Sequence, residues 1–270
     1  MSSATALMNV MMSAARKAAR GLKRDFGEVE QLQVSRKGPA DFVTAADLRA
    51  ERILREELSR ARPGYGFLME ETGEITGTDR THRWLVDPLD GTLNFMHGLP
   101  HFAISIALER DGQLVAGLIY DPVKEETFTA EKGRGAFMND RRIRVSARRD
   151  LTTCLLATGI PFPGRAEHAR FLMELETAMS SAAGVRRFGA AALDLAYVAA
   201  GRYDGFWERG LSPWDIAAGI VLIREAGGFV QDLDGGGSML TSGSILAGNL
   251  SLQPALTGLI RKSGMAKKAP

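Results

Sequence analysis

Residues 84–95 read WLVDPLDGTLNF, and this stretch decides how the chain is interpreted. An apolar run ends on Asp87, and Asp90 follows three residues later, beyond Pro88. Carboxylates beside buried apolar residues are costly unless hydrogen bonds or a positive charge compensate them. Pro88 prevents a helix from continuing, so the chain turns and both carboxylates can point to one side. The stretch therefore predicts two aspartates that hold a cation.

The residues after the first aspartate add other groups. The turn frees the Leu89 carbonyl to face the same point, and Gly91 allows the backbone to approach a ligand closely. If a helix begins after Gly91, the amides of Gly91 and Thr92 become an anion site. Metal ions beside an amide-lined anion site describe a centre that hydrolyses phosphate esters. The structural alternative is a simple turn, because Asp-Pro and Asp-Gly pairs are common in turns.

Three further acids stand in similar places. Glu70 and Glu71 end the apolar run GFLMEE, and Asp215 opens a helix in SPWDIAAG. In layered α/β folds, ligand sites collect where strands end and helices begin. Carboxylates without His or Cys beside them suit Mg²⁺ rather than Zn²⁺. Taken singly, Asp215 can also serve the helix dipole, and Glu70 and Glu71 can be solvated surface charges.

The composition excludes several classes of protein. The 270 residues are 45% hydrophobic and 24% charged, as in an ordinary globular protein. The net charge of +2, from 34 basic and 32 acidic residues, shows no strong nucleic-acid footprint. No apolar run reaches the roughly 18 residues of a membrane span. The single Cys154 excludes internal disulfides and favours a reducing, cytoplasmic location. Four histidines lack zinc-site spacing: His82, His97, His101 and His168.

Two helices are predicted near the N-terminus. The first 24 residues are basic, free of acids and amphipathic, which is typical of a mitochondrial transit peptide or of a first domain helix. The domain helix is favoured because its pattern runs without a break into FGEVEQL. A second amphipathic helix is predicted over residues 47–64, where Pro and Gly end it. Its predicted inner face consists of Leu48, Ile53, Leu54 and Leu58.

The rest of the chain is expected to form two halves. Turns at Asp111-Gly112 and at Pro122 predict antiparallel strands in HFAISIALERDGQLVAGLIYDPVKEETFTAEKG. Beyond these, strand-like and helix-like segments alternate. We expect an antiparallel α+β half, residues 1–147, that carries the metal and phosphate motifs. A layered α/β half, residues 148–270, is expected to pack against it and to complete an active-site cleft.

Together these features resemble the inositol monophosphatase family of Mg²⁺-dependent, lithium-sensitive phosphatases. WLVDPLDGTLNF is similar to the family's motif W-[IVL]-x-D-P-[IL]-D-G-T-x-N-F, and SPWDIAAGIVLIREAGG to W-D-x-A-A-G-x-x-[IL]-x-x-E-A-G-G. MEETG and DFVTAAD stand at the expected distances upstream. The resemblance spans nearly the whole chain. It implies a layered α-β-α-β-α sandwich of the sugar-phosphatase type, shared by inositol monophosphatases and fructose bisphosphatases.

The resemblance also implies the metal ligands. Glu70, Asp87 and the Leu89 carbonyl are similar to the ligands of a first Mg²⁺. Asp87, Asp90 and Asp215 are similar to those of a second. Glu70 would support a third, weakly held ion through water. Two or three ions per site are therefore expected.

Catalytic and substrate-binding roles follow in the same way. Thr92, with Asp47 behind it, resembles the pair that orients and deprotonates the attacking water, and Glu70 belongs with them. The amides of Gly91 and Thr92 would hold the phosphate. Besides these, the expected substrate-binding residues are Asp90, Gly189, Ala190, Ala191, Glu208 and Asp215.

Two departures from the family pattern bear on the substrate. Ala190 stands where the family often has Ser or Thr, so one possible hydrogen bond is lost. The family's upstream lysine appears as Arg36-Lys37. RRFGAAALDLAYVAAGRYDGFWERGLSPWD resembles the bacterial, SuhB-like branch, which implies inositol 1-phosphate and similar polyol monophosphates. Fructose 1,6-bisphosphate and 3′-phosphoadenosine 5′-phosphate are the alternatives within the fold.

A different class of function is a binding role, because some bacterial relatives associate with the transcription machinery. Such contacts could use a run of arginines, whose plainer interpretation is a solvated strand and turn. A homodimer without membrane or nucleic-acid partners is the default expectation. The run consists of Arg141, Arg142, Arg144, Arg148 and Arg149.

Overall fold

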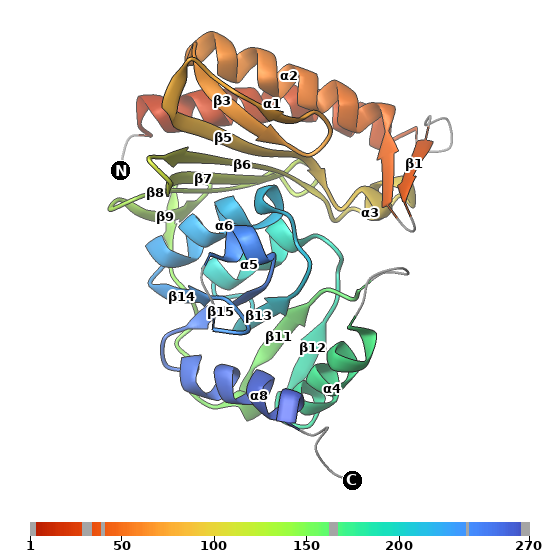
Figure 1. Ribbon diagram of the computed structural model, residues 1–270, viewed down its shortest axis with the longest axis vertical. Coiled ribbons are helices and arrows are strands. Elements are labelled where there is room, and N and C mark those ends of the chain that lie inside the picture. The colour runs from red at the N-terminus through yellow and green to blue at the C-terminus, as the bar shows by residue number, and fades with distance from the viewer. Residues whose placement is uncertain (1–3, 29–33, 39–40, 162–166, 236–237, 266–270) are drawn as a thin grey trace.

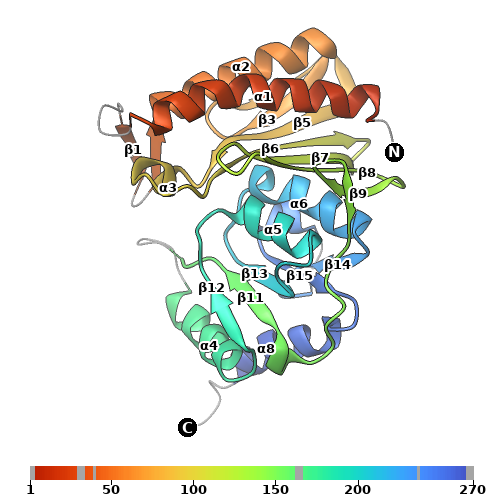
Figure 2. The same ribbon diagram turned by 180° about the vertical axis from the view of Figure 1, so that it is seen from behind.

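The protein is built from five stacked layers that alternate helices and sheets (Figure 1). The view from behind shows the same order (Figure 2). This arrangement confirms the predicted α-β-α-β-α sandwich. The computed structural model describes the backbone of residues 4–28, 34–38, 41–161, 167–235 and 238–265, and the side chains of these except at 34–38, 41–43 and 262–265.

Two helices, α1 (Ala6–Phe26) and α2 (Ala45–Ala61), form the first layer. Small and apolar residues of α1 are buried in the core beneath, as predicted for a domain helix. The predicted inner face of α2 is wrong at Leu48, which is 53% exposed. Asp47 and Glu51 hold buried positions of that face instead. Apolar periodicity misplaced the face because these two acids are bonded within the fold and do not face water.

An eight-stranded sheet forms the second layer, and nearly all its neighbouring strands are antiparallel, as predicted. The exception is the parallel pair β3 and β5. The strand order is β10-β9-β8-β7-β6-β5-β3-β4. The strands are β3 (Tyr65–Met69), β4 (Gly73–Ile75), β5 (Asp79–Asp90), β6 (Ala103–Arg110), β7 (Gln113–Asp121), β8 (Glu126–Glu131), β9 (Gly135–Met138) and β10 (Arg141–Ile143).

The middle layer consists of α5 (Ala191–Ala199) and α6 (Pro213–Glu225). A Cβ atom at Gly117 would come within 2.6 Å of the Ala218 carbonyl oxygen, so a glycine on β7 lets α6 lie directly on the sheet. Leu85 and Ile119 of the sheet share one core with both helices. This packing places the residues around α5 and α6 beside the ends of strands that come much earlier in the sequence.

A five-stranded sheet forms the fourth layer, and the helices α4 (His168–Met179) and α8 (Gln253–Met265) form the fifth (Figure 1). The strand order is β12-β11-β13-β15-β14, parallel as far as β13 and antiparallel beyond it. The division of the chain at residue 147 stays a prediction. The remaining elements are β1 (Val34–Gly38), β2 (Asp41–Thr44), α3 (Thr92–Met96), η2 (Leu151–Thr153), β11 (Leu155–Thr158), β12 (Gly184–Arg186), β13 (Gly205–Glu208), β14 (Gly228–Gln231), α7 (Met239–Ser242) and β15 (Ile245–Asn249).

Two surface properties follow from this architecture. Each described helix is too short or too polar to cross a lipid bilayer. The predicted arginine run begins on β10, an edge strand of the larger sheet, and its arginines are exposed. Arg148 also contacts Asp204 at 3.3 Å.

Candidate active site

The end of strand β5 carries both aspartates of the opening motif. Asp87 pairs with Ser105 of β6 and Asp90 pairs with Ala103, so Pro88 and Leu89 of β5 lie opposite the single residue Ile104 of β6. A separation of three would put the two side chains on opposite faces of a regular strand. The extra residue is a β-bulge, and it returns Asp90 to the face of Asp87. Pro88, which has no N–H to donate, lies within it.

A helix does begin after Gly91, which is the condition under which the amides of Gly91 and Thr92 can form an anion site. Gly91 has a φ of +92° and is the N-cap of α3, which begins at Thr92. A Cβ atom at Gly91 would lie 3.0 Å from the His101 carbonyl oxygen and 3.3 Å from the Ala190 Cβ atom. Glycine is therefore required both by the backbone conformation and by the close approach of another loop.

That second loop is the predicted substrate turn at residues 189–191. The Ala192 N–H donates to the Asp90 Oδ2 atom at 2.8 Å. Asn94 of α3 donates through its side-chain amide to the Phe188 carbonyl oxygen, also at 2.8 Å. Sequence reasoning missed Asn94, although its place inside the central motif was a signal. These bonds join two parts of the chain that are about a hundred residues apart.

Thr92 and Asp47 are brought together as the resemblance implied. The Thr92 Oγ1 atom lies 3.2 Å from the Asp47 Oδ1 atom and 3.0 Å from the Leu89 carbonyl oxygen. The other Asp47 oxygen accepts the Thr44 N–H at 2.8 Å, so Asp47 also caps α2. Burial raises the pKa of Asp47, although hydrogen bonds from Thr44 and Thr92 work in the opposite direction. A carboxyl held in this way can exchange a proton with the Thr92 hydroxyl.

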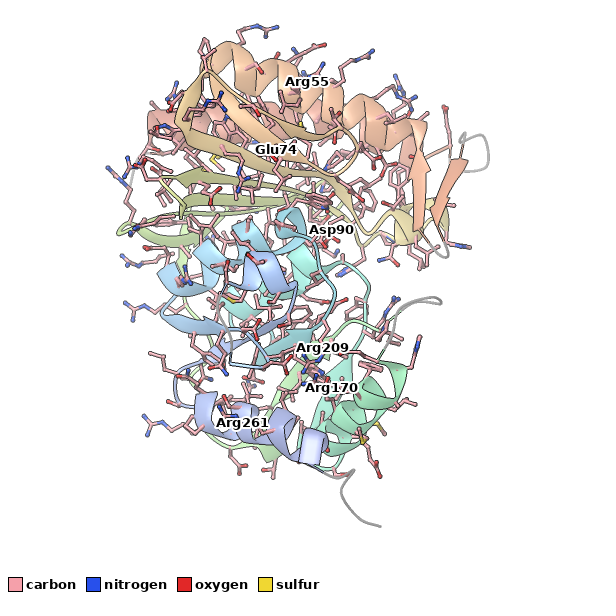
Figure 3. All side chains as sticks on the ribbon, viewed as in Figure 1. Arg55, Glu74, Asp90, Arg170, Arg209 and Arg261 are labelled. Atoms are coloured by element: carbon pink, nitrogen blue, oxygen red, sulfur yellow. The ribbon has the colours of Figure 1, made fainter. Side chains whose placement is uncertain are left out.

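The remaining acids act on one another electrostatically. Burial raises the pKa of Asp87 well above its usual range, and the charges of Glu70, Asp90 and Asp215 raise it further. Burial and the charge of Asp215 likewise raise the pKa of Asp90, against the bond from the Ala192 amide. Asp215 also accepts a hydrogen bond from the Ser212 N–H at 2.7 Å, so it caps the start of α6. Asp90 lies between the larger sheet and the middle helices (Figure 3).

These donors fit Mg²⁺ by their chemistry. Carboxylates and the Leu89 carbonyl offer oxygen ligands only, as Mg²⁺ prefers. Within the described residues, no three His, Cys, Asp or Glu side chains are already gathered closely enough to hold a metal ion. The donor types therefore fit Mg²⁺.

Two residues that the sequence did not point to lie near Glu208, which is a predicted substrate-binding residue. Asp194 of α5 is 1% exposed, and its Oδ1 atom has no hydrogen-bond partner among the described residues. Burial, followed by the charges of Glu208 and Asp90, raises the pKa of Asp194 well above its usual range. A single acid in the apolar run AAALDLAYVAAG was the available signal.

The second is Gly159, directly after β11, against which the Glu208 carboxylate lies. A Cβ atom there would be 1.8 Å from the Glu208 Oε1 atom. The side chains of two residues named from the sequence, Arg36 and Lys37, lie outside the described part.

The chain is similar to known proteins over nearly its whole length. The model of the inositol monophosphatase family matches residues 4–265. An inositol-1-monophosphatase of Mesorhizobium japonicum is 62% identical over 96% of this chain and 97% of its own length. The Nus factor SuhB of Escherichia coli is 43% identical over 94% and 96%. The crystal structure of the extragenic suppressor protein suhB from Bartonella henselae superposes with a TM-score of 0.93 at 58% identity, covering 96% of this chain and 99% of that one.

Proposed function

The chain belongs to the inositol monophosphatase family, and from this premise we propose that it releases phosphate from inositol 1-phosphate and similar polyol monophosphates, with Mg²⁺ as cofactor. The predicted family and the predicted enzyme class, a phosphoric monoester hydrolase, are both confirmed. The proposal adds the substrate, the metal and a role for each residue of the site.

One observation carries the proposal, namely the contacts of Thr92 with Asp47 and with the Leu89 carbonyl at the end of the strand that holds Asp87 and Asp90. A hydroxyl has one proton and can also accept one. Thr92 can therefore accept a hydrogen bond from the attacking water and pass a proton to Asp47. Burial, which raises the pKa of Asp47, favours its taking that proton. The water oxygen then forms a bond to phosphorus while the bond from phosphorus to the alcohol oxygen breaks, and the released alkoxide takes up a proton from solvent water.

The charge of the substrate explains the acids. A phosphate monoester dianion repels an incoming hydroxide, and its uncatalysed hydrolysis is among the slowest reactions known. When bound, Mg²⁺ supplies positive charge to the phosphate, to the attacking water and to the departing alkoxide. We assign Glu70, Asp87 and the Leu89 carbonyl to one ion, and Asp87, Asp90 and Asp215 to another. Glu70 would also hold a third ion through water.

The phosphate and the alcohol would be held by different parts of the site. We assign the phosphate to the amides of Gly91 and Thr92 at the start of α3. The hydroxyls of the alcohol would meet Asp90, Asp215, Glu208 and the turn at residues 189–191. Because Ala190 offers no hydroxyl, the Glu208 carboxylate carries more of the recognition. A carboxylate accepts hydrogen bonds and so favours an alcohol rich in hydroxyls.

The test is phosphate release from inositol 1-phosphate, fructose 1,6-bisphosphate and 3′-phosphoadenosine 5′-phosphate, with and without Mg²⁺, alongside Asp87→Asn. We expect Mg²⁺-dependent release, fastest from inositol 1-phosphate and absent in the variant. Release that needs no divalent ion would contradict the metal assignment. Faster release from either alternative would reassign the substrate.

A second function is favoured by the relatives named Nus factor SuhB, and by the exposed arginines that begin on β10. It is an association with the transcription machinery through protein contacts. Recovery of RNA polymerase subunits with the intact protein, and equally with Asp87→Asn, would establish it as separate from catalysis. Loss of recovery in the inactive variant would tie the two functions together.

The proposal also includes a homodimer in the cytoplasm. Light scattering on the purified protein would test the homodimer, since a monomeric mass at micromolar concentration would exclude a stable dimer. Lithium sensitivity follows from the resemblance and is tested by titrating lithium into the phosphate-release assay.

A further inference from the structure

The connection between Glu208 and Asp215 joins the proposed alcohol-binding residue to a proposed metal ligand. Glu208 is the last residue of β13, and its carboxylate lies directly over Gly159 at the end of β11. Strands β11 and β13 are parallel neighbours. The Thr158 hydroxyl donates to the Trp207 carbonyl oxygen at 2.8 Å and so holds these two strand ends together.

Arg209, the residue after Glu208, is held by acids from other elements. Arg209 donates from Nη2 to the Glu174 Oε1 atom at 2.9 Å and from Nη1 to the Asp234 Oδ2 atom at 2.9 Å. Arg170 contacts the same two acids, and Glu167 lies at 3.7 Å from Arg209. We call these five residues the arginine cluster. The Glu174 side chain is 1% exposed and that of Arg209 is 12% exposed.

The arginine cluster lies outside the proposed metal site. Arg170 and Arg209 are neighbours beside α4, below the layer that contains Asp90 (Figure 3). The cluster joins α4, the segment after β13 and the segment after β14. Arg209 therefore ties the end of β13 to two elements that contain none of the proposed metal ligands.

The Asp215 end of the connection has its own anchors. The Ser212 N–H donates to Asp215 at 2.7 Å, and the Leu211 N–H donates to the Gly243 carbonyl oxygen at 2.8 Å. The Ser105 hydroxyl donates to the Trp214 carbonyl oxygen at 3.1 Å. Loosening Arg209 would therefore remove an anchor directly beside Glu208 and leave the anchors of Asp215 in place.

We propose that Arg209 is a positioning residue that fixes the Glu208 carboxylate against Gly159, and so sets the affinity for hydroxyl-rich alcohols without acting on the phosphate chemistry. The inference rests on the proposed role of Glu208 in substrate binding. Its physical basis is geometric: a guanidinium makes several hydrogen bonds in fixed directions, so it holds the adjacent backbone more firmly than one point charge does.

The experiment compares two Mg²⁺-saturated reactions, on inositol 1-phosphate and on phenyl phosphate, whose leaving group has no further hydroxyl. Arg209→Met is combined with Glu174→Gln, so that no buried carboxylate is left without its partner. We expect the KM for inositol 1-phosphate to rise about tenfold, the effect of losing one hydrogen bond to a charged group. The kcat/KM for phenyl phosphate should stay within about twofold, and Arg209→Lys should restore part of the loss.

Arg170→Met is the matched control, because it removes the other guanidinium of the cluster at a distance from Glu208. It should leave the ratio of the two reactions unchanged. An equal loss on both substrates in the Arg209 variant would overturn the proposal and leave Arg209 a purely structural residue.

A crystal structure of the double variant tests the proposal apart from any activity. We expect the Glu208 carboxylate to leave Gly159 while the bond between Ser212 and Asp215 remains. If Glu208 stays in place, the positioning role is excluded even for an active enzyme. If Glu208 moves and neither reaction changes, Arg209 does position it, but the assigned role of Glu208 in substrate binding fails.

Discussion

Two groups of acids in this protein have opposite electrostatic settings. Among the strand-end acids, the charges that act on Asp87 come from Glu70, Asp90 and Asp215, and together with burial they raise its pKa. In the arginine cluster, partial burial works to raise the pKa of Asp234, but Arg170 and Arg209 outweigh it and the pKa is lowered. In the arginine cluster, arginines of the protein itself neutralise the acids. At the strand ends, the acids repel one another, so an added cation would stabilise them.

This difference separates function from stability. Acids that repel one another weaken the fold, and such an arrangement is typical of functional sites. Acids that are paired internally hold elements together. The same residue type would therefore serve the proposed catalysis at the end of β5, and it connects elements around α4. Each prediction below tests one side of this comparison.

The largest effect is expected for Asp87→Asn. Activity should fall on the order of a thousandfold, because several kcal/mol of metal-derived stabilisation are lost. In a chelator, the variant should unfold at the same temperature as the wild type or higher, since one repelling charge is gone. Phosphate release and thermal unfolding measure the two effects. A lower unfolding temperature would show that Asp87 is structural.

Glu174→Ala, in contrast to Asp87→Asn, should make the protein less stable. Removing one partner of a buried ion pair costs about 3 kcal/mol of unfolding free energy, the lower end of the usual range because Arg209 keeps Asp234. Urea unfolding measures this loss. Glu167→Ala is the matched control, since Glu167 is largely exposed and its longer contacts should contribute little. Equal losses in both variants would contradict the importance of burial.

Gly159→Ala tests whether Glu208 binds the substrate. The added Cβ atom would overlap the Glu208 carboxylate, which must then move. We expect the KM for inositol 1-phosphate to rise about tenfold with little change in stability, because no left-handed backbone is involved. Steady-state kinetics on inositol 1-phosphate and phenyl phosphate measure it. An unchanged KM would mean that Glu208 does not contribute to binding from this position.

The smallest effect concerns pH and Asp194. Its pKa is raised on folding, so its contribution to stability is full at low pH and is lost as pH rises through the raised value. Asp194→Asn removes this dependence and should gain stability relative to the wild type as the pH rises from 4 to 8, measured by urea unfolding in a chelator. A constant difference across that range would contradict the raised pKa.

The sequence alone determined the features that depend on chain neighbours. Pro88 made it possible to predict that the chain changes direction after Asp87 so that both aspartates face one side, and Gly91 that the backbone there can approach another group closely, because both residues act on their own backbone. Alternating apolar segments were enough to predict the antiparallel strands and the layered class. The family resemblance then suggested roles for acids that singly had plain structural explanations.

Only the tertiary structure decided the rest. The bulge that aligns Asp87 with Asp90 depends on pairing with β6, and the bond from Ala192 to Asp90 spans the two halves of the chain. The exposure of Leu48, the burial of Asp47 and Glu51 on α2, and the arginine cluster also escaped prediction. The physical reason is shared: burial and charge pairing depend on residues that are distant in sequence, whereas turns and helix ends depend on adjacent ones.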